Sequence, residues 1–171
     1  AIVDAVNDAH KRGVNIRVIY HAKKNDKQTL ENEHSLKKIP ASKKRGRVTS
    51  KIFHNKFIVL SKVNAQGKRL PQAVLCGGTT FTENGLYRQA NVVHVADDKS
   101  VADIYEELFD VVWDAPDDVG VARDWINQNT PMDPDSTIYA GFSPRSGGGD
   151  LAEFINIMQA ADKDLLFATA F

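Results

Sequence analysis

Two residues with complementary chemistry, His54 and Lys56, stand just ahead of a short apolar run, Phe57 to Leu60. The run contains β-branched residues and polar residues bound it, which predicts a β-strand. Side chains at i and i+2 of a strand point to the same face, so His54 and Lys56 should project together while Asn55 faces away. An imidazole beside an ammonium suits chemistry on an anion, because the lysine binds negative charge while the histidine transfers a proton or attacks.

A glycine pair, Gly77-Gly78, lies downstream of this run. Ala73 to Cys76 predicts a second short strand that ends at the glycines. Glycine lets main-chain N–H groups approach a phosphate closely. The hydroxyls of Thr79, Thr80 and Thr82 would stand near the same turn. We therefore expect the two strands to bring a histidine, a lysine and a glycine turn together around a phosphate group.

This combination resembles the phospholipase D superfamily, whose signature is H-x-K-x4-D followed by G-S-x-N. The residues that match the signature are His54, Lys56 and Gly77. The residues that depart from it are Ser61 in place of Asp, Gly78 in place of Ser and Thr80 in place of Asn. Residues 81–91, F-T-E-N-G-L-Y-R-Q-A-N, are also similar to the segment that follows the motif in bacterial members. The resemblance spans roughly residues 1–113 and, more weakly, the rest.

The resemblance implies a fold and a mechanism. The fold is α/β, a mixed β-sheet flanked by helices in an α/β/α sandwich, seen here as a fragment. The activity is that of a metal-independent phosphodiesterase without cofactors. Two H-x-K motifs, from two halves or two subunits, meet so that one histidine attacks phosphorus and the other protonates the leaving oxygen. His54 is then nucleophile or general acid, and Lys56 holds the phosphoryl oxygens.

Three further residues are candidates for binding the phosphate or orienting these groups. A Thr80 hydroxyl can bond a phosphate oxygen or orient Lys56, although it is shorter than an Asn amide and has one donor fewer. Gly78 contributes no hydroxyl. Asn91 stands where relatives hold the histidine ring, which makes it a candidate orienter. Ser61 is several positions along the strand from the substrate, so its departure matters least to the chemistry.

Other reactive side chains have simpler interpretations. The remaining histidines have no partner residues at a spacing that would indicate a site, and we interpret them as structural or exposed: His10, His21, His34 and His94. Cys76 sits in an apolar strand and is expected to be buried filler. Arg145 is expected to be a loop residue, with a phosphate contact as the alternative. The basic run from Lys43 to Lys51 is interpreted as a solvated surface loop, or alternatively as a basic lip that guides a polyanionic substrate.

Composition places few limits on function. The chain has 171 residues, with 22 basic and 22 acidic side chains and a formal net charge of +0, so nothing demands a nucleic acid or an anionic membrane as partner. A single cysteine excludes an internal disulfide. No apolar run approaches the roughly 20 residues of a membrane-spanning helix.

The periodicity of apolar residues, together with cap and turn residues, predicts the helices and strands that position the motif. Before the motif these are a helix over 2–9 ending at Gly13, a strand over 14–20 and a short helix over 27–38. After it they are a hairpin loop over 62–71, a strand over 91–95, a helix from Ser100 as N-cap to about Trp113, and a short helix over 119–127.

The pattern restarts after a predicted linker, residues 129–136. A strand over 137–142, a helix from Asp150 and a strand over 165–171 are expected to form a right-handed crossover. We interpret residues 1–128 as the latter part of a first phospholipase D-like half with one H-x-K motif, and residues 137–171 as the start of a second. The expected partners are thus a phosphodiester substrate and a second H-x-K motif from the missing half or a second subunit.

Three functional hypotheses remain open. The first is a phosphodiesterase acting on a phospholipid or a nucleic acid. The second is a catalytically degenerate member that binds phosphate-bearing ligands, motivated by the departures at Ser61, Gly78 and Thr80. The third is an accidental match on an ordinary α/β domain.

Overall fold

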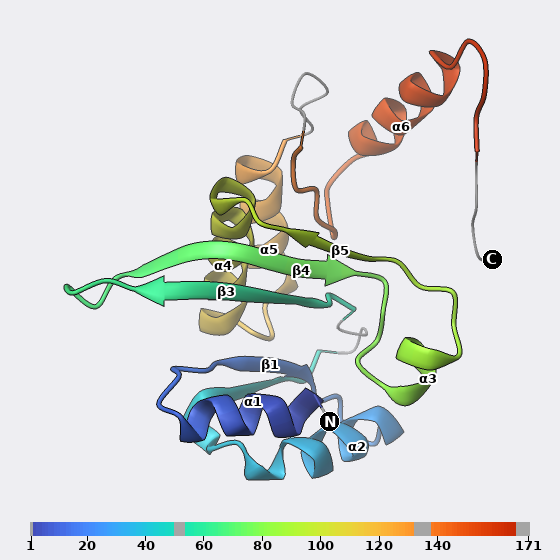
Figure 1. The fold of residues 1–171 in the computed structure, drawn as a ribbon. Coiled ribbons are helices and arrows are strands. Elements are labelled where there is room, and N and C mark those ends of the chain that lie inside the picture. The colour runs from blue at the N-terminus through green and yellow to red at the C-terminus, as the bar shows by residue number, and fades with distance from the viewer. Residues whose placement is uncertain (1, 50–53, 132–137, 167–171) are drawn as a thin grey trace.

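The computed structural model describes residues 2–49, 54–131 and 138–166. Figure 1 shows two small β-sheets, one of two strands and one of three, with helices packed around them. Helices α1 and α2 lie beside the two-stranded sheet, and α4 and α5 lie behind the three-stranded one. The predicted mixed α/β fold class is confirmed.

The two-stranded sheet forms from the N-terminal quarter of the chain. Helix α1 (Ile2–Lys11) leads through Gly13, whose φ of 90° suits glycine, to strand β1 (Val18–His21). Strand β1 pairs in parallel with β2 (Lys44–Arg47). The crossover between them holds helix α2 (Lys27–Ser35) and two 3-10 turns, η1 (Leu36–Lys38) and η2 (Ala41–Lys43). Strand β2 lies within the run predicted as an irregular basic loop, so that prediction was wrong.

The three-stranded sheet carries the motif. Strands β3 (Phe57–Val63), β4 (Arg69–Gly77) and β5 (Val93–Ala96) are antiparallel neighbours in that order. The Asn64 side chain closes the β3–β4 turn by accepting from the N–H groups of Gln66 and Lys68 at 3.0 and 2.8 Å. The predicted hairpin is confirmed.

Helix α4 (Lys99–Asp114) covers one face of this sheet. Val101 and Ala102 pack against Val74, and Phe57 and Val59 join the same cluster. Strand residues that alternate with these are exposed on the other face, including Ile58, Leu60 and Val95.

The cap of α4 corrects one prediction. Asp98 caps the helix by accepting from the Val101 N–H at 3.0 Å, and Ser100 lies inside the first turn. Helix α5 (Val119–Asn129) is capped in the same way by Asp118. Helix α4 ends just before Pro116, as expected, and α5 begins just after it.

A second core cluster joins α4, α5 and β1. Its buried members are Leu108, Val112, Ala122 and Ile126. Ile19 of β1 packs on this cluster, so α4 contacts strands of both sheets. One helix therefore fixes how the two sheets stand relative to each other.

The segment after the linker differs from its prediction. Residues 138–142 form no strand, because no neighbouring strand pairs with them among the described residues. Phe142 instead packs its ring edge-on against Tyr105, with centroids 4.7 Å apart. Helix α6 (Gly149–Gln159) forms close to where a helix was predicted. The strand predicted over 165–171 is not present at 165–166, and the rest lies outside the described residues.

Candidate active site

His54 and Lys56 directly precede β3 and lie against the end of β4. The Lys56 carbonyl accepts from the Gly77 N–H at 3.3 Å, which continues the β3–β4 ladder through the motif. The next residue, Phe57, anchors the stretch, since its ring packs edge-on against Tyr105 with centroids 5.1 Å apart. The lysine of the motif and the glycine turn are thus adjacent, as the sequence predicted.

The residues around Lys56 differ in exposure. His54 is exposed, so it is not a core histidine. Asn55 is half-buried and lines a cavity of about 50 Å³ together with Ile19, Phe57 and residues of α4. Residues 54–56 precede the strand and Lys56 is half-buried as well, so the predicted alternation of His54 and Lys56 against Asn55 stays a prediction.

Lys56 is held by its own loop. Its Nζ donates to the His54 carbonyl oxygen at 2.7 Å. Partial burial lowers the pKa of the Lys56 ammonium, because desolvation disfavours the charged form. An ammonium has three N–H donors, so the contact with His54 fixes the side chain and leaves donors for an oxyanion.

The glycine turn is built for close packing of strands. Gly77 has a φ of 154°, and a Cβ there would lie 2.2 Å from the Val92 carbonyl oxygen. The Gly78 N–H donates to that same oxygen at 3.1 Å. The N–H groups of both glycines are thus committed to Lys56 and Val92, contrary to the expectation of free donors for a phosphate.

The loop after the turn is closed by local hydrogen bonds. Thr82 caps the short helix α3 (Glu83–Tyr87), and its Oγ1 accepts from the Gly85 N–H at 3.1 Å. Gly85 lies directly on Thr80, because a Cβ on Gly85 would be 2.2 Å from the Thr80 carbonyl oxygen. The Asn91 amide donates to the Gly85 carbonyl at 2.9 Å and so ties the two ends of the loop.

The structure brings three of the predicted site residues, Gly78, Thr80 and Asn91, together in the loop after β4. Gly78 and Thr80 are exposed at the turn, while Thr79 is buried. The Asn91 Oδ1 lies 3.7 Å from where a Cβ on Gly78 would be. The Asn91 amide N–H donates to Gly85 rather than to His54. The role of Asn91 in orienting the His54 ring therefore stays a prediction.

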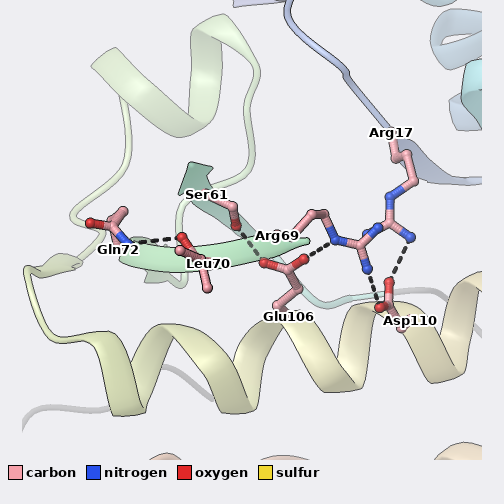
Figure 2. Close-up of polar contacts among 7 residues, drawn as sticks. All are labelled: Arg17, Ser61, Arg69, Leu70, Gln72, Glu106 and Asp110. Carbon is pink, nitrogen blue, oxygen red and sulfur yellow. Dashed lines mark hydrogen bonds and ion pairs between the residues drawn. The ribbon is translucent and has the colours of Figure 1, made fainter. Parts of the chain in front are cut away.

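Ser61 lies away from this group, at the far end of β3. Its hydroxyl donates to Glu106 of α4, which also accepts from Arg69 of β4 (Figure 2). The sequence interpretation missed Glu106. No local spacing marks it, since its partners stand 45 and 37 positions away.

The basic run makes contacts within the fold. Lys43 donates to the Asn15 side chain at 2.7 Å, and Lys44 to the Leu36 carbonyl at 2.8 Å. The Arg45 guanidinium lies 4.7 Å from the ring centre of Trp113. Arg47 is buried, and desolvation lowers its pKa although Asp117 partly opposes this. These contacts position β2, while Lys51 lies outside the described residues.

Three other residues take structural positions. Arg145 donates to the Phe142 carbonyl at 3.0 Å and to Thr130, which supports its interpretation as a loop residue. Cys76 packs against the core cluster beneath α4 but is only partly buried, so it is less enclosed than predicted. His21 is buried, and its Nε2 lies 3.5 Å from an Asp26 carboxylate oxygen.

Comparison with known proteins identifies the family. A family model described as cardiolipin synthase, PLD-like domain, matches residues 1–113. A search of curated proteins finds no match. Within the described ranges, no helix is both long and apolar enough to cross a membrane. The family match covers the motif, the glycine turn and most of α4, and the chain belongs to the phospholipase D superfamily.

Proposed function

We propose that this chain is part of a metal-independent phosphodiesterase that works through a phosphohistidine intermediate. The observation that supports the proposal is the backbone pairing of Lys56 with Gly77, which joins the H-x-K motif to the glycine turn, together with the exposure of His54. Family membership supports a phosphodiester as substrate.

The reaction needs two histidines on opposite sides of phosphorus. One imidazole nitrogen forms the P–N bond as the P–O bond breaks, and the other histidine gives its proton to the leaving oxygen. That second histidine then takes a proton from water, which attacks phosphorus and releases the first. Lys56 neutralises the charge on the phosphoryl oxygens during both steps.

His54 supplies one of the two histidines, as nucleophile or as acid. The other comes from a second H-x-K motif, in a second half or a second subunit. We propose that residues 1–128 belong to the first half, and that residues 137–171 open the second after the linker at 129–136. A single copy of the chain should be inactive as a monomer, because one imidazole cannot attack and protonate from both sides.

The name of the matched family and the net charge of +0 favour a phospholipid over a nucleic acid. The contacts of the Lys43–Arg47 side chains within the fold point the same way, since they are occupied by the chain itself. Comparing cleavage of phospholipid vesicles with cleavage of an oligonucleotide decides between the two.

Replacing His54 tests the mechanism. In a protein that holds both motifs, His54→Ala should lower hydrolysis of bis(p-nitrophenyl) phosphate by about 10³-fold or more. The matched control is His94→Ala, an exposed histidine on β5, which should keep the rate. Full activity of His54→Ala would refute the proposal.

A non-catalytic module is the second candidate. It is favoured by the Lys56 Nζ contact with the His54 carbonyl and by the lack of a hydroxyl at Gly78. Trapping by denaturation at alkaline pH, where the P–N bond survives, distinguishes the two, since a catalytic protein should yield a covalent phosphohistidine. Phosphate binding without any trapped adduct, for every phosphodiester tried, would favour the module.

A further inference from the structure

A buried carboxylate links the motif strand to helix α4. Glu106 is 7% exposed, and its two oxygens accept from the Ser61 hydroxyl and from Arg69 Nε. Arg69 also donates to Asp110, whose other oxygen lies 2.6 Å from Arg17 Nη1. Figure 2 shows this chain of contacts, which joins β3, β4 and the residue just ahead of β1 to one helix.

The charges in this group balance. Two carboxylates, on Glu106 and Asp110, meet two guanidinium groups, on Arg17 and Arg69. A buried carboxylate is costly unless it is paired and hydrogen-bonded, and Glu106 is both. Ser61 adds a neutral donor, so it completes the bonding of Glu106 without changing the charge.

An aspartate at position 61 would not fit this arrangement. It would set a second carboxylate against Glu106 oxygen atoms that now accept from a hydroxyl, and two such groups cannot both ionise cheaply. Serine at 61 and glutamate at 106 therefore suit each other. The carboxylate that the signature places on the strand is supplied here from the helix.

The contact also acts where the β3–β4 pairing is irregular. Leu60 pairs with Ala73 but Ser61 pairs with Pro71, so Gln72 is an extra residue in β4. A slip of one residue would turn every side chain of β3 to the opposite face. Glu106 holds Ser61 toward α4. Because side chains alternate along a strand, this contact also sets which face of the sheet each residue of β3 takes, from Ser61 back toward Lys56.

We propose that Glu106 is a positioning residue for the candidate site, and that it takes the part of the motif carboxylate. It acts on His54 and Lys56 through Ser61 and β3, and on the glycine turn through Arg69 and β4. The inference rests on the proposed function for its significance, but the contact can be tested without activity.

The test is a double-mutant cycle in the 171-residue chain. Glu106→Ser and Ser61→Asp should each lower the Tm by about 6 °C or more, because the first removes the acceptor shared by Ser61 and Arg69 and the second sets a carboxylate against the buried Glu106. The double variant Ser61→Asp/Glu106→Ser restores one carboxylate and one hydroxyl. Its Tm should be higher than that of either single variant. A double variant no more stable than the singles would overturn the exchange of carboxylate and hydroxyl.

The ring resonance of His54 tests positioning. The Cε1–H signal, assigned with His54→Gln, should shift in both single variants and return in the double variant. The control is Glu107→Ser, which removes the exposed carboxylate adjacent to Glu106 on α4. It should change neither the Tm nor the His54 signal. A lowered Tm with an unmoved His54 signal would overturn the positioning role. Loss of the proposed function would instead appear as undiminished hydrolysis by His54→Ala, with the cycle intact.

Discussion

The described residues before the linker (2–49 and 54–131) and those after it (138–166) were predicted from similar patterns, yet they fold differently. In the first region, strands find partners and α4 packs on them to form two core clusters. In the second, residues 138–142 form no strand and α6 leaves Leu151, Phe154 and Ile157 exposed. Figure 1 shows α6 extending away from the sheets. An apolar alternating run becomes a strand only where another strand accepts its hydrogen bonds.

The largest expected contrast is in side-chain truncation. Leu108 is 1% exposed between α4 and α5, so Leu108→Ala should cost about 2–5 kcal/mol in urea unfolding. Ile157 is 53% exposed, and Ile157→Ala should change stability by less than about 0.5 kcal/mol. Equal losses for the two variants would break the contrast between the regions.

Glycine substitution gives the next contrast. Gly77→Ala places a methyl group 2.2 Å from the Val92 carbonyl at a left-handed φ, and should cost about 2–4 kcal/mol. Gly149 starts α6 with nothing within 4 Å of a Cβ, so Gly149→Ala should not destabilise the chain. Both are measured by thermal unfolding. A tolerated Gly77→Ala would show that β4 and β5 are less closely packed than described.

The smallest expected effect is the pH dependence due to Lys56. Burial lowers its pKa in the folded chain, so the unfolded chain binds more protons between that pKa and about 10.4. Stability should therefore rise with pH across this window for the wild type relative to Lys56→Met. Urea unfolding at intervals between about pH 8 and 11 measures the difference. A constant difference, or one of opposite sign, would show that Lys56 is not desolvated.

Local signals in the sequence predicted much of the first region. Helix α1, the β3–β4 hairpin and the stripe of α4 follow from periodicity and turn residues. The cap of α4 was misplaced by two residues, because Asp98 and Ser100 are both good caps and only geometry separates them. Strand β2 reads K-R-G-R and has no apolar alternation. It is a strand because β1 pairs with it, which is a long-range cause.

For the candidate site, too, some features could be predicted from the sequence and others depend on long-range contacts. The adjacency of Lys56 and Gly77 could be predicted, since two consecutive strands of a hairpin must pair. The use of the glycine N–H groups could not, because it depends on where β5 enters beside Val92. The place of Glu106 was also beyond local pattern, since its partners come from two other strands.

Helix α4 meets Val74 and Phe57 of one sheet and Ile19 of the other, and Asp110 binds Arg17 near the latter. The sheets are joined through this helix rather than through a shared hydrogen-bond ladder. A displacement of α4 along its axis would therefore be transmitted to both at once. The helix therefore couples the sheet that follows the H-x-K motif mechanically to the N-terminal crossover.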